Sequence, residues 1–427
     1  MRRGIRTIGA LASLMLLAFP TSHQAAADER KQAWYLEEFR AAEMWQRSQG
    51  QGITVAVIDS GVDSTVPELR GQVLEGMDFL TGEGTGQLDN DGHGTAMAAL
   101  VAGTGAGGGV QGLAPKAKIL PLRVANQPTN DFEFGAIEDN MIQAIEFAAN
   151  SDARILSIAV GSRVNATRQQ ERIDAAISEA ARRDKLIFVA AGNSADNDIK
   201  NSLFAFQEGT IGVAATGRDG ERAPYSAHGS FVGLAAPGRE ISLRCDFPAG
   251  EVCVREGGTS SASALASASA ALIWSANPEW TKNQVLRVMM ETADGPSKTP
   301  RNHYVGYGTV RPDRVILDGE GDPGDPDVNP MFERYEAALD PPATPEPSAG
   351  GQEEPGTSGG DDQEAGTESA GTSAGAGDSP EERAAESGGE GRSIGGPAAL
   401  FGLAGVVIVA GGLAAWWMRR RQDTGTT

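Results

Sequence analysis

Short runs of apolar residues alternate with longer amphipathic segments through most of the chain. The apolar runs are rich in β-branched residues, which predicts strands buried on both faces of a parallel sheet. The longer segments carry apolar residues at helical spacing, which predicts helices that cover the sheet. The pattern predicts an α/β domain of three layers with a mainly parallel sheet, over residues 52–318. The predicted strands are residues 53–59, 117–124, 154–160, 185–191 and 210–216, and the clearest helices are residues 134–150 and 170–185.

The pattern changes after Asp318. Residues 319–393 are mainly Gly, Pro, Ser, Thr, Ala, Asp and Glu, with very few aromatic residues. Such a composition cannot bury enough surface to offset the entropy of ordering, so we expect a disordered linker. The segment holds 19 acidic and 3 basic residues, a net charge of −16 out of −21 for the whole chain. The acidity therefore belongs to the linker, and the negative overall charge argues against nucleic-acid binding.

The first 27 residues have the layout of a secretory signal peptide. Three arginines precede the apolar run ALASLMLLAF, and small residues follow before Asp28, which is the order of regions in such signals. A buried N-terminal helix is the alternative. Residues 28–51 then form an extension whose aromatic residues we expect to pack on the domain surface. At 24 residues it is too short for a folded inhibitory domain, so we expect no zymogen control by a cleaved prodomain.

A second apolar segment lies near the C-terminus. Residues 397–418 carry no charge over 22 residues, enough for a helix to span a hydrocarbon core of about 30 Å. Trp416 and Trp417 would lie at the interface, and the three arginines that follow predict a cytoplasmic tail at residues 419–427. A buried soluble helix is the alternative, but after a polar linker it has nothing to pack against. We therefore expect a single-pass membrane protein whose α/β domain is extracellular.

Of the four histidines, one stands in a setting suited to catalysis. His23 falls in the signal peptide, and His228 and His303 lie in polar loops, where a surface role is the ordinary interpretation. His93 lies in NDGHGTAMAALVAG, where a glycine-rich turn runs into a helix of small residues. We expect the two flanking glycines to leave space for a substrate beside the His93 ring.

Three further residues complete the requirements of serine-based hydrolysis, which are a hydroxyl, a base, a carboxylate that orients the base and an oxyanion donor. Asp59 ends the first predicted strand, at the sheet edge where α/β folds present functional groups. Ser260 stands at the start of a Ser/Ala-rich helix. The N-terminus of a helix carries partial positive charge, which here lies near the nucleophile. Asn193 follows the buried run KLIFVAAG, where its amide could donate to an oxyanion. Each also has a structural alternative: a turn cap, a tightly packed core helix and a turn asparagine.

Together and in this order, the motifs are specific. VAVIDSGVD, GHGTAMAALVAG, VAAGNS, LAAPG and GTSSASA resemble the motifs of the subtilisin-like serine proteases. The spacings of 34, 100 and 67 residues between Asp59, His93, Asn193 and Ser260 also resemble that family's. The resemblance covers about residues 34–318. It implies a subtilisin-like fold, a triad of Asp59, His93 and Ser260, an oxyanion donor at Asn193, and peptide hydrolysis through an acyl-enzyme without a cofactor or metal ion.

The whole layout looks most like a mycosin. Mycosins are the membrane-anchored subtilisin-like proteases associated with type VII secretion in high-GC Gram-positive bacteria. This resemblance implies protein or peptide substrates outside the membrane and type VII secretion components as partners. The alternative function is a scaffold that stabilises a secretion complex, with proteolysis secondary. The intact set of four residues favours the endopeptidase, because a scaffold does not require them.

The chain departs from the family pattern inside the site. Ser261 and Ala264 stand where the family has Met and Pro in the nucleophile helix, and loss of the proline removes a kink-prone residue. Ala159 replaces a serine that is common in the substrate-binding strand of relatives. We therefore expect the walls that set side-chain specificity to differ.

Two predictions concern covalent and metal stabilisation. The only two cysteines, Cys245 and Cys253, are expected to form a disulfide in an exported protein, with free thiols as the alternative. Relatives that hold calcium near the histidine helix use a loop rich in side-chain oxygens. Here residues 104–110, TGAGGGV, offer only Thr104, whereas Ca²⁺ takes about six to eight oxygen ligands. We therefore expect no calcium at this loop.

Overall fold

The computed structural model describes residues 33–126, 136–161, 169–195, 203–245, 247, 251–295 and 300–339. The chain divides into two units, Met1–Glu346 and Pro347–Thr427, and every described residue belongs to the first. The predicted signal peptide (residues 1–27), membrane segment (397–418) and tail (419–427) lie outside the described residues. Among the described residues, no helix combines the length and the apolar character that crossing a bilayer requires.

Seven strands form the central sheet, in the spatial order β2-β3-β1-β4-β5-β6-β7. Every neighbouring pair in it is parallel. All five predicted strands are present, which confirms the α/β class, and β2 and β7 extend the sheet at its two edges. The strands are β1 Thr54–Asp59, β2 Met77–Asp78, β3 Lys118–Arg123, β4 Ile155–Ile158, β5 Leu186–Ala190, β6 Ile211–Thr216 and β7 Val232–Pro237.

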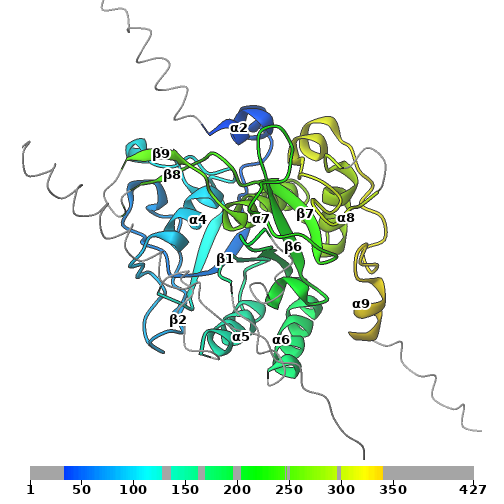
Figure 1. The fold of residues 1–427 in the computed structure, drawn as a ribbon, viewed down its shortest axis with the longest axis horizontal. Coiled ribbons are helices and arrows are strands. Elements are labelled where there is room, and N and C mark those ends of the chain that lie inside the picture. Colours follow the sequence, from blue (N-terminus) through cyan, green and yellow to red (C-terminus); the bar gives the residue numbers. More distant parts are fainter. Residues whose placement is uncertain are drawn as a thin grey trace, which may run out of the picture. The chain divides into compact units, whose positions relative to one another are not determined.

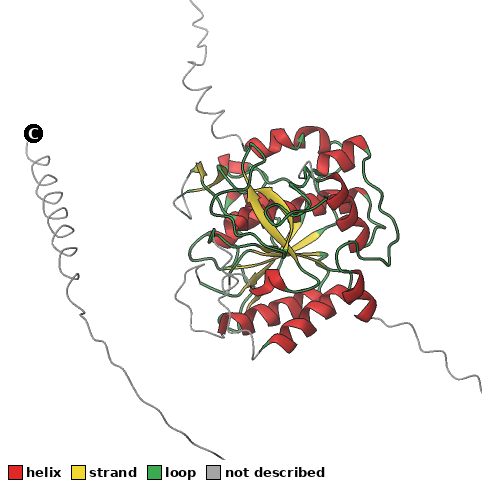
Figure 2. Cartoon of the chain, turned by 45° about the vertical axis from the view of Figure 1, so that its right-hand side comes forward, coloured by secondary structure: helices red, strands yellow, loops and turns green. Residues whose placement is uncertain are grey.

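Alternate residues of β1 face two different helical layers. Val55 and Val57 of β1 belong to the core that includes α4 and α7, whereas Ala56 and Ile58 belong to the core that includes α5 and α6. This two-sided burial explains why the strands read as continuous apolar runs. Figure 2 shows the strands between the helical layers, and Figure 1 labels these helices. The helices are α4 His93–Ala102, α5 Ala136–Ala149, α6 Gln170–Arg182 and α7 Thr259–Ala276.

Helix α7 is buried from Thr259 through Trp274, because its residues are mostly Ser and Ala. Two of its serines donate hydrogen bonds at 2.8 Å to carbonyls one turn earlier, Ser267 to Ser263 and Ser269 to Leu265. These bonds satisfy hydroxyl groups that would otherwise be buried without a partner. The helix runs without interruption through Ala264, the position where the family has proline. Small residues thus allow α7 to lie against several strands and against α4.

The remaining described elements surround this core. A two-stranded antiparallel hairpin lies outside the main sheet. The hairpin strands are β8 Ile241–Arg244 and β9 Val252–Arg255, the other helices are α2 Trp34–Glu38, α3 Ala41–Met44, α8 Lys282–Thr292 and α9 Glu333–Leu339, and the short helical turns are η1 Pro67–Leu69, η2 Ala106–Gly108, η5 Leu203–Phe206 and η6 Arg314–Asp318.

The N-terminal extension packs on the domain as two short helices, α2 and α3. Tyr35, Phe39 and Met44 are fully buried. The indole N–H of Trp34 donates to the Arg239 carbonyl at 3.1 Å, and that of Trp45 donates to the Leu113 carbonyl at 2.8 Å. The expected packing role of these aromatic residues is therefore confirmed, and the extension belongs to the folded domain.

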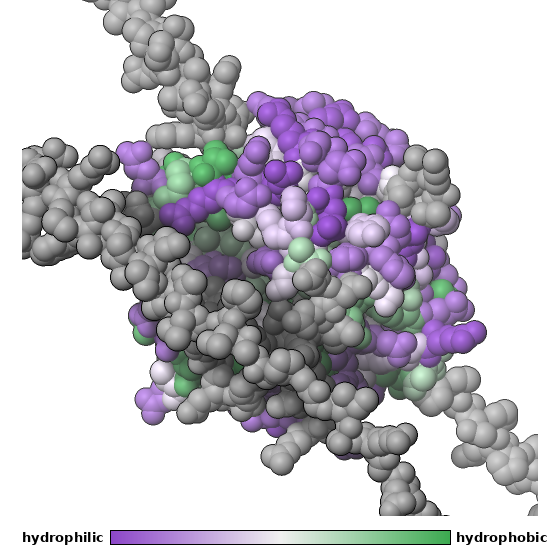
Figure 3. Space-filling model, in the orientation of Figure 1, coloured by the Kyte–Doolittle hydropathy of each residue, from purple (hydrophilic) through white to green (hydrophobic). Residues whose placement is uncertain are grey.

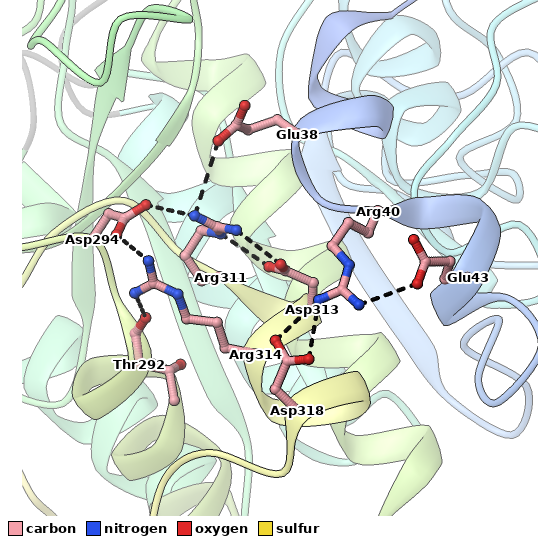
Figure 4. Close-up of polar contacts among 9 residues, drawn as sticks. All are labelled: Glu38, Arg40, Glu43, Thr292, Asp294, Arg311, Asp313, Arg314 and Asp318. Carbon is pink, nitrogen blue, oxygen red and sulfur yellow. Dashed lines mark hydrogen bonds and ion pairs between the residues drawn. The ribbon is translucent and has the colours of Figure 1, made fainter.

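An ionic network joins this extension to the C-terminal part of the domain (Figure 4). Arg40 lies 3.0 Å from Asp318, and Arg311 lies 3.9 Å from Glu38. The Arg40 and Asp318 side chains are 38% and 39% exposed, so this pair contributes little to stability. Arg311 also pairs at 2.8 Å with Asp313, whose side chain is only 1% exposed. The network therefore connects the N-terminal extension to residues 311–318.

The ordered domain continues past Asp318, where the sequence predicts the start of a disordered linker. Helix α9 places Glu336 within 2.6 Å of the ammonium of Lys282 on α8, and both side chains are largely buried. Asn329 is 5% exposed and donates to Glu336 at 2.8 Å. Residues 319–339 are therefore part of the domain, and the linker prediction is wrong for them. These few polar residues are held by specific partners on the domain, which composition does not reveal.

The surface carries an apolar groove beside the hairpin. Figure 3 shows green, apolar residues at the upper left, close to β9 and α2. The groove is lined by residues of α2, α3, the loop after α4 and the hairpin, and its lining includes none of the four predicted catalytic residues. Its apolar lining residues are Ala33, Leu36, Ala41, Ala42, Trp45, Val110 and Val252.

Candidate active site

Asp59 and His93 meet where β1 ends and α4 begins. His93 Nδ1 lies 2.7 Å from Asp59 Oδ1, and the same oxygen accepts the Ser60 backbone N–H at 2.7 Å. The Asp59 side chain is 1% exposed, whereas that of His93 is 22% exposed. The carboxylate is therefore sealed inside the protein, while the imidazole keeps an open side.

The two glycines beside His93 pack closely against neighbouring residues, and the space they were expected to leave for a substrate stays a prediction. A Cβ on Gly94 would collide with the Gly61 carbonyl and lie 3.0 Å from the Asp59 Cβ. Gly92 has a φ of 87°, and a Cβ there would collide with the ring of Phe247. The absence of a side chain at Gly94 lets α4 approach β1 closely enough for His93 to reach Asp59.

The electrostatic setting of His93 is dominated by carboxylates. Burial lowers the pKa of its imidazole, but the charges of Asp59, Asp91 and Asp89, together with the Asp59 hydrogen bond, raise it to about 9. An isolated histidine titrates near 6.5. The surroundings therefore favour the positively charged imidazolium form of His93. A histidine takes this form when it accepts a proton from a nucleophile.

Asp89 was not singled out in the sequence, although it lies four residues before His93. It is 7% exposed and accepts hydrogen bonds from the N–H of Gly92 (2.9 Å) and from the N–H (2.9 Å) and hydroxyl (2.6 Å) of Thr95. Burial raises the pKa of the Asp89 carboxyl above its ordinary value, against the lowering effect of these bonds. Asp89 thus caps the start of α4, where N–H groups lack partners within the helix. The sequence signal was the pair of aspartates in DNDGHG, residues 89–94.

Ser260 lies in the first turn of α7 and is 9% exposed. Its hydroxyl donates to the Ala159 carbonyl at 3.2 Å, directly after β4. Sequence comparison drew attention to Ala159 because of its missing hydroxyl group. In the structure its main chain, which any residue would supply, contacts the predicted nucleophile.

Asn193 is held by the helix that carries Ser260. Its Oδ1 accepts the N–H of Thr259 at 2.9 Å and the Thr259 hydroxyl at 3.0 Å. The Thr259 oxygen in turn accepts the Gly192 N–H at 3.0 Å. Because the amide oxygen is occupied, the Nδ2 group is the part of Asn193 that remains for donation to a ligand. Thr259 is a second residue that sequence reasoning missed, although it directly precedes the predicted nucleophile.

The predicted Cys245–Cys253 disulfide is present and ties β8 to β9, with 5.9 Å between the Cα atoms. Phe247, which lies between the two cysteines, contacts Gly92 just before His93. The hairpin is also held by Arg244, whose guanidinium lies 2.5 Å from the Glu68 carboxylate, and both side chains are largely buried. The bridged hairpin therefore reaches Gly92, the residue that precedes His93.

The loop predicted to lack calcium lies against that same carboxylate. A Cβ on Gly109 would collide with the Glu68 carboxyl group, and the Thr104 hydroxyl donates to the Glu68 carbonyl at 3.0 Å. Within the described ranges, no group of three or more His, Cys, Asp or Glu residues is arranged to hold a metal ion. Glu68 is neutralised here by Arg244.

His228 and His303 each contact another part of the domain. His228 stacks on Tyr304, with 4.9 Å between ring centroids. The carbonyl of His303 accepts the Gly229 N–H at 2.8 Å. His93 is therefore the histidine that the fold brings to Asp59.

The model of the subtilase family matches residues 50–308, more than half of the chain. The chain belongs to the subtilase family. It is a subtilisin-like serine endopeptidase. Thermitase of Thermoactinomyces vulgaris is 32% identical over 206 residues, which cover 48% of this chain and 70% of the relative. Subtilisin E of Bacillus subtilis (strain 168) is 31% identical over 263 residues, which cover 61% of this subtilase and 65% of the relative.

Solved structures similar to this subtilase include two mycosins. The MycP3 protease from the type VII (ESX-3) secretion system is 28% identical with a TM-score of 0.57, and the match covers 66% of this chain and 87% of that one. MycP1 with its N-terminal propeptide removed is 26% identical with a TM-score of 0.58, over 67% of this chain and 97% of that one. Both resemblances that the sequence indicated are therefore confirmed: the chain is a member of the subtilase family, and its structure is similar to those of mycosins.

Proposed function

We propose that this subtilase hydrolyses peptide bonds with Ser260 as nucleophile, His93 as general base and then acid, and Asp59 as the carboxylate that orients the imidazole. The 2.7 Å hydrogen bond between His93 Nδ1 and the buried Asp59 is the observation that supports this most. A carboxylate at Nδ1 keeps the proton on that nitrogen and leaves Nε2 free to accept the proton of a hydroxyl.

The reaction then follows from these roles. The Ser260 hydroxyl turns from the Ala159 carbonyl towards His93, Oγ attacks the peptide carbonyl, and its proton passes to Nε2. Asn193 Nδ2, which is free to donate because Thr259 holds the amide oxygen, stabilises the oxyanion. His93 next protonates the leaving amine as the C–N bond breaks. Water attacks the acyl-enzyme in the same way, releases the acid and restores Ser260.

We also propose that the enzyme works outside the cytoplasm, anchored by residues 397–418, on protein or peptide substrates. The disulfide supports an oxidising compartment. The predicted signal peptide and the uncharged segment support export and anchoring. The structural likeness to proteases from type VII secretion systems supports components of such a system as partners.

The test of the triad is a graded series of variants. Ser260→Ala and His93→Ala should each abolish hydrolysis and labelling by a fluorophosphonate, and the double variant should be little worse, because triad members act as a unit. Asp59→Asn should cost roughly 10⁴ in turnover because it favours the wrong histidine tautomer. Asn193→Ala should cost less, about 10²–10³, because backbone donors still hold part of the oxyanion charge. Circular dichroism of each variant provides the folding control.

A scaffold role in a secretion complex is the second candidate, favoured by the likeness to mycosins. It predicts that Ser260→Ala supports full secretion in cells. Wild-type protein that fails to react with the fluorophosphonate, together with full secretion by Ser260→Ala, would reject the protease function in favour of the scaffold. Equal loss of activity in all four single variants with loss of folding would contradict the assigned roles.

A further inference from the structure

A polar bridge links the end of β1 to the start of α4, independently of the Asp59–His93 contact. The hydroxyl of Ser60 accepts the Gly94 N–H at 3.0 Å and lies 3.0 Å from Asp91 Oδ1 and 3.1 Å from Asp89 Oδ1. Asp91 Oδ1 also accepts the backbone N–H of His93 at 2.7 Å. Ser60 is 1% exposed, so this bridge lies inside the protein.

The two carboxylates of the bridge are not equivalent. The single proton of the Ser60 hydroxyl serves only one of them at a time. Asp89 accepts four further bonds, from the N–H groups of Asp91, Gly92 and Thr95 and from the Thr95 hydroxyl. Asp91 has a buried second oxygen, Oδ2, that has no hydrogen-bond partner among the described residues. The charge of Asp91 is therefore the less compensated of the two, and it lies against the main chain of His93.

We propose that Asp91, held by Ser60, is a positioning residue that fixes the start of α4 and stabilises the imidazolium of His93 during acylation. This inference rests on the proposed function of His93 as the general base. The acidic groups that act on His93 are Asp59, Asp91 and Asp89, and Asp59 remains the direct partner. Asp91 adds a second negative charge from the turn that precedes α4.

The proposal predicts that the pH profiles of labelling for wild type and for Asp91→Asn cross. Asp91→Asn keeps an oxygen that can accept the His93 N–H but removes the charge. We expect the second-order rate constant for fluorophosphonate labelling to rise with pH as His93 loses its proton. In the variant this rise should occur at a pH lower by about one unit, which is the lower end of the pKa change that a nearby charge causes. The plateau at high pH should fall roughly threefold, because a less basic imidazole is a weaker base in the transition state. The variant should thus react faster than wild type at low pH and more slowly at high pH.

Asp63→Asn is the matched control. Asp63 lies near the same turn, and its carboxylate accepts the N–H and hydroxyl of Thr65 at 2.8 and 2.7 Å, which asparagine can also do. It is not among the groups that act on His93. Its profile should coincide with that of wild type.

The outcomes separate this inference from the proposed function. A wild-type protein that does not label overturns the triad and this inference together. A wild-type protein that labels, with an Asp91→Asn profile that is unmoved or lowered equally at every pH, overturns only the role of Asp91. If circular dichroism shows that Asp91→Asn does not fold, Asp91→Ser replaces it, since its hydroxyl can also accept the His93 N–H.

Discussion

At the scale of single residues, His93 links catalysis to stability. The net effect of burial and of the charges of Asp59, Asp91 and Asp89 is a pKa of about 9 in the folded state, against about 6.5 in an unfolded chain. A raised pKa means that the folded state binds the proton more tightly. Its contribution to stability is therefore fully present below about pH 6.5 and is lost as the pH rises through about 9. Relative to His93→Gln, which cannot titrate, the wild type should lose free energy of unfolding between about pH 6 and about pH 10. Urea unfolding of both proteins measures this difference, and a difference that is constant with pH would contradict the prediction.

At the scale of elements, the bridged hairpin β8–β9 supports the approach to His93. Opening the Cys245–Cys253 bridge should lower the free energy of unfolding by roughly 2–3 kcal/mol in the chain-entropy model. The domain should remain folded, because the buried pair of Arg244 and Glu68 still holds the hairpin. Labelling by a fluorophosphonate should slow, because Phe247 contacts the residue before His93. Urea unfolding and labelling with and without reductant test this. The Cys245→Ser/Cys253→Ser variant should have the stability and labelling rate of the reduced protein, and reductant should change neither. An effect of reductant on this variant would refute the role of the disulfide.

At the scale of the whole molecule, two truncated chains test the boundary of the domain and the membrane anchor independently. A chain that ends at Leu339 keeps Glu336 and lacks the proposed anchor, so it should appear in the medium, fold and label like wild type. A chain that ends at Asp318 leaves the buried ammonium of Lys282 without its partner, which costs about 3–5 kcal/mol for a broken buried pair. Thermal unfolding of the two secreted chains measures this loss. Retention of the chain ending at Leu339 in the membrane fraction would refute the anchor, and equal stability of the two chains would refute the role of Glu336.

The sequence by itself determined the class of fold, the family and the candidate residues of the site. Strands buried on both faces appear as apolar runs, because each residue of such a strand meets a core whichever way it points. The order and spacing of the motifs around Asp59, His93, Asn193 and Ser260 identified the family. The disulfide was also predictable, because the chain has only two cysteines.

Only the tertiary structure decided which of these residues lie in contact. The contact of Asp59 with His93 depends on the close approach of Gly94 to the Gly61 carbonyl, which no local pattern contains. The roles of Asp91 and Glu336 depend on partners 31 and 54 residues away in the chain. A local window of sequence records periodicity and residue type, which govern secondary structure and burial. Charge compensation depends on which distant groups fold into contact and how much water is excluded, and those quantities exist only once the elements have packed.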